Sequence, residues 1–257
     1  MDIVLIGSGN VATILGRKSL DAGHRIVQVY SPDKNHADLL AAKLGSISTS
    51  RISTLINDAA LTIIAIRDEA VAPLAREIAH IKSVVAHTSG AVSINVLENI
   101  SDSFGVLYPL QSLRKEIELL PPVPMLVDGN NAEATRLLKE FASGLSDKVF
   151  LANDKSRLEY HLAATIVNNF TNHLFALANS FCEKESISFT ALQPLIEETV
   201  TRLRKQSPAA VQTGPAFRND QLTLESHRRL LKEYPSLLEI YELFTKEIQK
   251  LKSNNES

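Results

Sequence analysis

A short apolar run over residues 2–6 leads directly into the segment GSGNVA at 7–12, which limits the fold more than any other feature of the sequence. A strand over 2–6 followed by a helix over 10–22 places two glycines between a strand end and a helix start. Gly7 permits the tight turn, Gly9 leaves room for a pyrophosphate beside the backbone, and Ala12 lets the helix pack closely on the strand. The free N–H groups and positive dipole end of such a helix favour an anion. The predicted dinucleotide site includes Gly7, Gly9, Asn10 and Val11.

Short apolar runs alternate with helical patterns through the first 150 residues, which is typical of a parallel sheet covered by helices on both faces. Strands are expected at 3–6, 25–30, 61–66, 83–86, 104–108, 125–127 and 149–151. Beyond them only helical patterns follow, at about 154–184, 188–206, 220–233 and 235–252, and the tail over 252–257 is expected to be disordered. The predicted fold class is α/β, with a Rossmann-type doubly wound sheet in a domain over 1–152 and an all-α domain over 153–257.

Composition excludes several kinds of partner. The chain has 257 residues, a net charge of −2 and no long basic run, so neither nucleic acid nor an anionic membrane surface is expected to bind. The longest apolar region, 158–181, is interrupted by Asn and His residues and is a poor membrane span. Cys182 is the only cysteine, which excludes an internal disulfide and fits a reducing compartment. We expect a cytoplasmic protein with a small-molecule substrate; a metal site is not expected, since no His, Cys, Asp or Glu cluster has ligand spacing.

The second strand ends at Ser31, where NAD-binding domains of this type carry an Asp or Glu for the ribose 2′-OH. A serine hydroxyl accepts a 2′-phosphate that a carboxylate would repel, and Lys34 and His36 follow closely enough to help. In the alternative interpretation, residues 31–33 only form a turn and a helix cap, and Asp33 reaches the ribose by another route. The sequence favours NADP (NADPH) over NAD.

Two further strand ends are unusually polar. Arg67 begins the sequence RDE at 67–69, and the sequence HTSG follows the strand at 83–86. Either cluster alone is an ordinary turn, but both lie on the edge of the sheet that carries the glycines, where ligands of doubly wound sheets bind. Tyr108 ends another strand at the same edge. We predict Arg67 as a cofactor residue, and as substrate residues His87, Thr88, Ser89 and Tyr108.

The helix at 154–184 is apolar nearly all round, a pattern typical of a buried helix. His161, Thr165, Asn168 and Asn172 form a polar stripe along it, at spacings of four, three and four. The stripe is either a hydrogen-bonded seam between helices or subunits, or the wall that faces substrate and nicotinamide.

A second polar group of residues follows the glycine–proline break at 214–215. Asp220 is expected to cap the helix that carries His227 on the same face. Capping explains Asp220 but leaves Arg218 and His227, gathered beside the same turn, without an explanation.

These segments together resemble a family of bacterial proteins over nearly the whole chain. In that family a Rossmann-like domain, related to deazaflavin-dependent NADP oxidoreductases and pyrroline-5-carboxylate reductase, precedes a helical domain of unknown function. The pattern appears here in HTSG at 87–90, YPL at 108–110, YHLAA at 160–164 with NN at 168–169, PL at 194–195, and TGPA at 213–216 with Arg218, Asp220 and His227. The resemblance implies an NADP-linked oxidoreductase that assembles as a homodimer through its helical domain, and it implies no substrate.

Better-known relatives, the 3-hydroxyacid dehydrogenases and ketopantoate reductases, carry a catalytic lysine four residues before an asparagine on the first long helix. Here those positions hold Ala164 and Thr165. His161 could supply the proton instead, and an imine substrate, already basic, needs no such lysine.

We therefore expect an NADP(H)-dependent oxidoreductase for a small carbonyl, hydroxyacid or imine compound. His161 would be the acid or base, Asn168 would hold the reacting atom, Arg218 would pair with a carboxylate, and His227 would help to close the pocket. The alternative is a catalytically silent NADP-binding sensor or scaffold protein.

Overall fold

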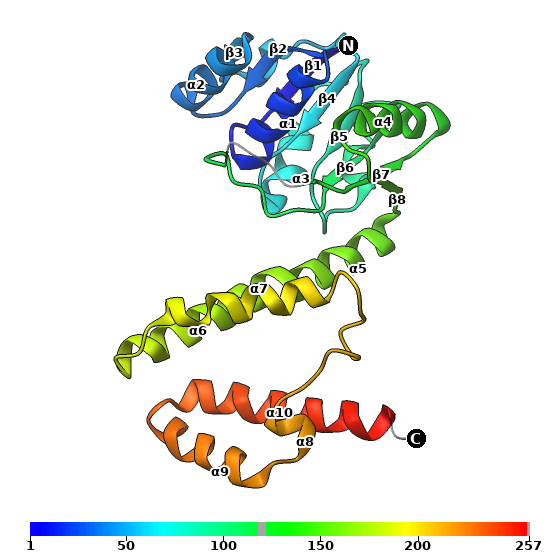
Figure 1. The fold of residues 1–257 in the computed structure, drawn as a ribbon. Coiled ribbons are helices and arrows are strands. Elements are labelled where there is room, and N and C mark those ends of the chain that lie inside the picture. The colour runs from blue at the N-terminus through cyan, green and yellow to red at the C-terminus, as the bar shows by residue number, and fades with distance from the viewer. Residues whose placement is uncertain (118–121, 256–257) are drawn as a thin grey trace. The chain divides into compact units, whose positions relative to one another are not determined.

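The computed structural model of the chain describes residues 1–117 and 122–255 (Figure 1). It divides into two compact units, Met1–Phe170 and Thr171–Ser257. The first unit holds the whole sheet and also the beginning of the long helical run. The domain boundary predicted between residues 152 and 153 lies just after the last strand and stays a prediction.

An eight-stranded sheet forms the centre of the first unit, in the order β3-β2-β1-β4-β5-β6-β7-β8. All neighbouring strands are parallel except β6 and β7. The strands are β1 (Asp2–Ile6), β2 (Arg25–Tyr30), β3 (Ile47–Thr49), β4 (Leu61–Ile64), β5 (Val84–His87), β6 (Phe104–Pro109), β7 (Met125–Gly129) and β8 (Val149–Leu151). The predicted Rossmann-type sheet is confirmed. Strand β3 was not expected, because its sequence, IST, has one apolar residue and forms no apolar run.

Four α-helices lie between the strands of the first unit, and two of them start at a side-chain cap. They are α1 (Asn10–Asp21), α2 (Lys34–Leu44), α3 (Asp68–Glu77) and α4 (Ala132–Leu145), with 3₁₀ turns η1 (Ile52–Thr54) and η2 (Ile94–Leu97). Asp33 caps α2 by accepting the His36 N–H, and Asn131 caps α4 in the same way. In the described part of the chain, no side chain caps α1 or α3. The first turn of α1 is therefore left open to a ligand.

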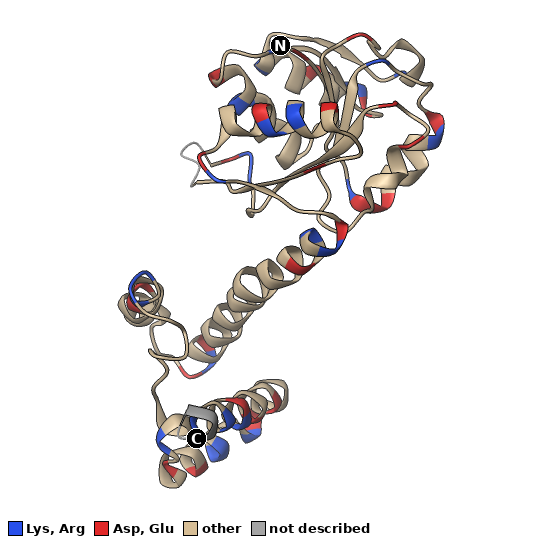
Figure 2. Cartoon of the chain, turned by 90° about the vertical axis from the view of Figure 1, so that its right-hand side faces the viewer, with Lys and Arg blue, Asp and Glu red and all other residues tan. Residues whose placement is uncertain are grey.

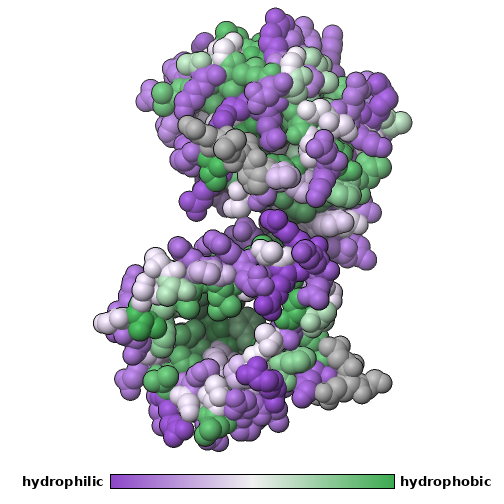
Figure 3. Space-filling view, viewed as in Figure 1, coloured by the Kyte–Doolittle hydropathy of each residue, from purple (hydrophilic) through white to green (hydrophobic). Residues whose placement is uncertain are grey.

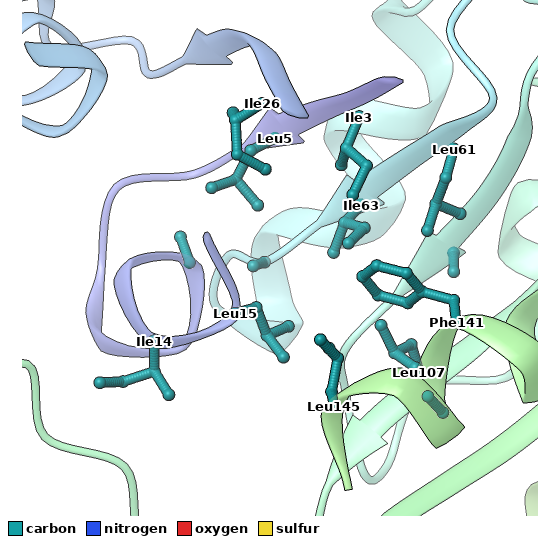
Figure 4. Packing of buried hydrophobic residues seen from close by; sticks show 14 of the residues in the cluster. Ile3, Leu5, Ile14, Leu15, Ile26, Leu61, Ile63, Leu107, Phe141 and Leu145 are labelled. Carbon is teal, nitrogen blue, oxygen red and sulfur yellow. The ribbon is translucent and has the colours of Figure 1, made fainter. Parts of the chain in front are cut away.

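Apolar side chains fill both faces of the sheet. On one face, Phe141 of α4 is fully buried against strand residues that include Leu61 and Leu107 (Figure 4). A second cluster, around Val4, Ile64 and Val85, fills the other face. Two covered faces explain why the strands read as continuous apolar runs and not as alternating ones.

Helices make up the rest of the chain. They are α5 (Asp154–Ala164), the π-helical segment η3 (Thr165–Phe170), α6 (Thr171–Lys184), η4 (Phe189–Leu192), α7 (Gln193–Arg202), α8 (Pro215–Arg218), α9 (Gln221–Leu230), η5 (Leu231–Glu233) and α10 (Pro235–Asn255). The predicted all-helical region is confirmed, although the π-helical segment was not foreseen. The expectation of a disordered tail is wrong as far as residue 255, and residues 256 and 257 lie outside the described residues.

Large apolar side chains of the long helical run are exposed in the single chain. Leu162 is 59% exposed, Val167 is 71% exposed and Phe170 is 57% exposed. The expectation that this helix is buried is therefore wrong for one copy of the chain, in which these side chains stay open to solvent. Figure 3 shows hydrophobic residues at the surface of the helical part of the chain. Among the described helices, none is both long and apolar enough to cross a bilayer.

Candidate active site

The glycine loop between β1 and α1 has two glycines with different structural demands. Gly7 has a φ of +119°, and its N–H donates to the Tyr30 carbonyl at 2.8 Å. A Cβ at Gly7 would lie 2.2 Å from the Ala65 carbonyl oxygen, so only glycine fits. Gly9 has an extended backbone, and a Cβ there would meet no described atom within 4 Å. The space above Gly9, next to the uncapped start of α1, fits a pyrophosphate.

A cavity of about 470 Å³ opens beside this loop. It brings together all six predicted cofactor residues and the end of β4. The lining consists of Gly7, Ser8, Gly9, Asn10, Val11, Tyr30, Ser31, Pro32, Ala65, Ile66, Arg67, Ala70 and Leu74. Ser31 is buried, and its hydroxyl accepts a hydrogen bond from the Ser8 hydroxyl at 3.1 Å. Arg67 is exposed and pairs with Glu69 at 3.1 Å. The residues present fit a bound dinucleotide.

The lysine predicted to help Ser31 is already engaged. The Lys34 ammonium donates to Asp38 and, at 3.0 Å, to the Ser48 hydroxyl. Two other lysines, Lys43 and Lys115, line a small cavity of about 90 Å³ together with Ser8 and His36. Spacing along the sequence gave no signal for these two lysines, because α2 and a distant loop bring them together.

The segment after β5 is a tightly bonded turn. His87 is fully buried; its Nδ1 accepts the Ser89 N–H at 3.2 Å, and its Nε2 lies 3.4 Å from the Ser93 carbonyl oxygen. Burial and the nearby charge of Arg157 lower the pKa of His87 to about 4, so the ring is neutral at physiological pH. The Ser89 hydroxyl accepts the N–H groups of residues 91 and 92, and the Thr88 hydroxyl lies 3.4 Å from the Ile64 carbonyl. These bonds favour a structural role for residues 87–89, and their contact with substrate stays a prediction.

Arg157 is a buried cation that the sequence gave no reason to select. Its side chain is 1% exposed, and its Nη2 donates to the Val92 carbonyl at 2.5 Å and to Asp154 at 2.7 Å. Asp154 also accepts the Ile94 N–H at 3.1 Å. Burial alone would raise the pKa of Asp154, but hydrogen bonds that include those from Arg157 and Ile94 lower it. These hydrogen bonds hold the first turn of α5 against the turn that follows β5.

One helical turn beyond Arg157, His161 meets Tyr108 from the end of β6. The Tyr108 hydroxyl and His161 Nδ1 are 2.8 Å apart, and the two rings lie edge to face with centroids 5.9 Å apart. Both rings pack over Gly90, where a Cβ would lie 2.8 Å from His161 Nδ1 and 3.0 Å from Tyr108 Cζ. Gly90 therefore leaves the space in which the pair forms. Of the predicted residues, Tyr108 and His161 are in direct contact, beside the segment that contains His87.

A cavity of about 550 Å³ lies against this pair. Its lining is uncharged apart from the ionisable Tyr and His rings: Tyr108, Leu110, Gln111, Ser112, Tyr160, His161, Ala163, Ala164, Thr165, Val167, Asn168 and Asn169. Asn168 is exposed to the cavity from the π-helical segment, so three members of the polar stripe, His161, Thr165 and Asn168, face the same space. π-helical turns are frequent at functional sites. These groups line an open cavity instead of a closed seam within the first unit.

Charges near Tyr108 act on it in opposite directions. Burial raises the pKa of the Tyr108 hydroxyl, the carboxylate of Asp68 raises it further, and the guanidinium of Arg157 lowers it. Asp68 stands at the start of α3, directly after Arg67. The hydroxyl is accordingly held in its neutral form, ready to donate a hydrogen bond.

The second predicted polar group lies in the C-terminal unit. Asp220 caps α9 by accepting the Thr223 N–H at 3.1 Å, which confirms the predicted cap. Hydrogen bonds from Thr223 lower the pKa of Asp220, and the charges of Arg218 and His227 lower it further. His227 Nδ1 lies 2.9 Å from the Tyr241 hydroxyl, and Arg218 is exposed. The predicted place of Arg218 and His227 in the substrate pocket stays a prediction. Within the described residues, no three His, Cys, Asp or Glu side chains are grouped to hold a metal ion.

The sheet and its open glycine loop define a Rossmann-type dinucleotide-binding protein. Residues 2–90 match the family model for NADP oxidoreductase, coenzyme F420-dependent, and residues 123–248 match a domain of unknown function, DUF2520. A candidate NADP oxidoreductase from Bacteroides fragilis is 36% identical, with 97% of this chain and 98% of that chain covered and a TM-score of 0.88. The chain belongs to this family of NADP oxidoreductases. It is an NADP-dependent oxidoreductase.

Two more distant structures share the fold. A 1-pyrroline-5-carboxylate reductase from Streptococcus pyogenes is 15% identical, with 98% of both chains covered and a TM-score of 0.66. A reductive aminase from Aspergillus terreus, in complex with NADPH and ethyl-5-oxohexanoate, is 16% identical, with 97% of both chains covered and a TM-score of 0.70. No curated protein matches the sequence.

Proposed function

We propose that the protein reduces a small imine or carbonyl compound, or oxidises the corresponding amine or hydroxyacid, in the cavity beside Tyr108 and His161. The observation that carries this proposal is the hydrogen bond between Tyr108 and His161 at the cavity wall, since both side chains are able to donate a proton. A reductive aminase and a pyrroline-5-carboxylate reductase of the same fold support this class of substrate. NADPH supplies the hydride when it is bound.

The residues that would hold NADPH are those of the 470 Å³ cavity. Gly7, Gly9, Asn10 and Val11 would cradle the pyrophosphate, Ser31 would accept the 2′-phosphate, and the exposed Arg67 would lie along the dinucleotide. Ser31 at the end of β2 is buried and bonded to the Ser8 hydroxyl, so that no carboxylate stands there to repel the phosphate.

The residues of the second cavity would act on the substrate. His161 would be the source of the proton, since it is one of few side chains that donate one near neutral pH. Asn168 would hold the reacting nitrogen or oxygen, while Thr88 and Ser89 would shape the floor behind it. Arg218, with His227 beside it, would pair with a substrate carboxylate if the substrate carries one.

A homodimer assembled through the long helical run is part of the proposal. Residues 160–182 contain no Lys, Arg, Asp or Glu, as Figure 2 shows along α5 and α6, and the apolar side chains there are exposed in one copy. Removing these partly exposed apolar side chains from water would favour an assembly. The single, buried Cys182 is consistent with a cytoplasmic protein.

The test is turnover. Purified protein is mixed with NADPH and either 1-pyrroline or ethyl 5-oxohexanoate plus an amine, and loss of NADPH absorbance is followed; Gly9→Val, which should not bind the cofactor, is the matched control. Turnover by the wild type alone supports the proposal. The competing hypothesis, a silent NADP sensor or scaffold, expects tight NADPH binding without transfer of deuteride from labelled NADPH to any imine or carbonyl compound.

A further inference from the structure

We propose that Tyr108 is the terminal proton donor of this site and that His161 returns a proton to it. The inference deepens the proposed function and rests on it. It adds a catalytic role for Tyr108 and an order of proton transfer, with His161 placed one step behind.

The geometry of the pair sets this order. His161 Nδ1 is engaged by the Tyr108 hydroxyl at 2.8 Å, and the Nδ1–Cγ side of the ring faces Gly90, so this nitrogen is directed at Tyr108 and the turn, not at the cavity. Tyr108 is the next-to-last residue of β6, which lies beside β5 and runs parallel to it. Its hydroxyl lies at the carboxyl edge, where ligands of doubly wound sheets bind.

A tyrosine in this position needs a partner that returns its proton. Tyr108 is partly buried and the Asp68 carboxylate acts on it, both of which disfavour a tyrosinate; Arg157 opposes them, but its Nη2 is already bonded to Val92 and Asp154. His161 is the group bonded to the Tyr108 hydroxyl in the described residues. His161 in its imidazolium form can therefore give a proton to the Tyr108 oxygen after Tyr108 has donated its own proton to the substrate.

The transfer balances as follows. The substrate carbon receives the hydride, and the substrate nitrogen or oxygen takes the proton of the Tyr108 O–H, which becomes the amine N–H or the alcohol O–H. Tyr108 oxygen then takes the proton from Nδ1 of the His161 imidazolium. His161 Nε2 exchanges protons with water and restores the cation.

Three variants separate the two residues kinetically. With 1-pyrroline as probe, Tyr108→Phe should lose about 10²- to 10⁴-fold in kcat and keep its NADPH affinity, because phenylalanine has no proton to give. His161→Ala should lose less and recover in part when imidazole is added, since imidazolium from solution can return a proton to the Tyr108 oxygen. Tyr234→Phe, which removes a tyrosine hydroxyl bonded to Glu185 in the C-terminal unit, is the control for loss of a hydroxyl.

A second measurement needs no substrate. In full-length protein labelled with ¹⁵N-histidine, Tyr108→Phe should move the Nδ1 signal of His161, whereas Tyr234→Phe should leave it unchanged. If the Nδ1 signal of His161 is unchanged in Tyr108→Phe, the proposed proton transfer from His161 to Tyr108 is wrong.

The kinetic outcomes also decide between the proposals. If His161→Ala loses activity on the 10²-fold scale or more while Tyr108→Phe works within a few-fold of the wild type, then His161 is the terminal donor and the relay is wrong. If the wild type turns over neither probe, the proposed function fails, and the ¹⁵N measurement still decides whether the two side chains share a proton.

Discussion

Replacing Gly9 by valine should strongly weaken cofactor binding without weakening the fold. The backbone at Gly9 is extended, with φ −82° and ψ −165°, a conformation open to any residue, and a Cβ there would meet no described atom within 4 Å. The valine side chain would instead stand in the space above the first turn of α1. A pyrophosphate could then no longer approach the backbone N–H groups of that turn.

The size of the effect follows from the bonds that are lost. Two hydrogen bonds to a charged phosphate are worth about 1.5–3 kcal/mol each, so losing both weakens NADPH binding by about 10²- to 10⁴-fold. The stability of the apo protein should change by less than about 1 kcal/mol, because the lower entropy of the unfolded chain offsets the loss of a favourable N-cap glycine.

Gly7→Ala provides the contrast. It forces an L-residue to a φ of +119° and puts a methyl group 2.2 Å from the Ala65 carbonyl oxygen. We expect a loss of at least about 2 kcal/mol, or about 4–8 °C in Tm. Fluorescence titration with NADPH and thermal melts of the apo proteins measure both quantities. A Gly9→Val protein that binds NADPH like the wild type, or that melts as early as Gly7→Ala, would refute the reasoning.

Three further predictions concern other parts of the chain. Ser31→Asp should shift the preference from NADPH toward NADH, because a carboxylate there repels the 2′-phosphate and can bind the ribose 2′-OH; paired titrations that show an unchanged ratio of the two Kd values would contradict it. His87 has a pKa of about 4 in the folded protein against 6.5 for the ordinary side chain, so the unfolded chain takes up the proton first as pH falls. The free energy of unfolding should accordingly decrease by about 3 kcal/mol between pH 6.5 and pH 4, and His87 should have no further effect on it below pH 4. In His87→Asn, the urea midpoint should depend less on pH across that range than in the wild type. Leu162→Asp, which puts a charge in the exposed apolar face, should give a monomer in light scattering and leave NADPH binding intact; a Leu162→Asp protein that still forms the wild-type dimer would place the interface elsewhere.

The fold was predictable because its signals are local. Apolar runs, glycines and the Asp220 cap each act over a few residues, and they identified seven of the eight strands and the all-helical region. The Tyr108–His161 pair was harder, since its two members stand 53 positions apart and meet only because β6 and α5 pass the same turn. Sequence analysis selected both residues but not their bond.

Other site features left no readable signal in the sequence. Arg157 looked like one more helical arginine among surface charges, and its burial is set by the Val92 carbonyl and Asp154. The π-helical segment at 165–170 contains no glycine or proline that would mark a change of helix type. Lys43 and Lys115 converge through the packing of α2 and a distant loop. Such features depend on tertiary placement, which residue spacing does not encode.

Gly90 has a consequence for anyone who would re-engineer this protein. It is not part of the cavity wall, so a mutant library built from wall positions would leave it out, yet it sets how closely the Tyr108 and His161 rings approach. Alanine or serine at this position would put a Cβ 2.8 Å from His161 Nδ1 and 3.0 Å from Tyr108 Cζ, so the two rings would have to shift. The position offers a way to tune the proton pathway independently of substrate shape.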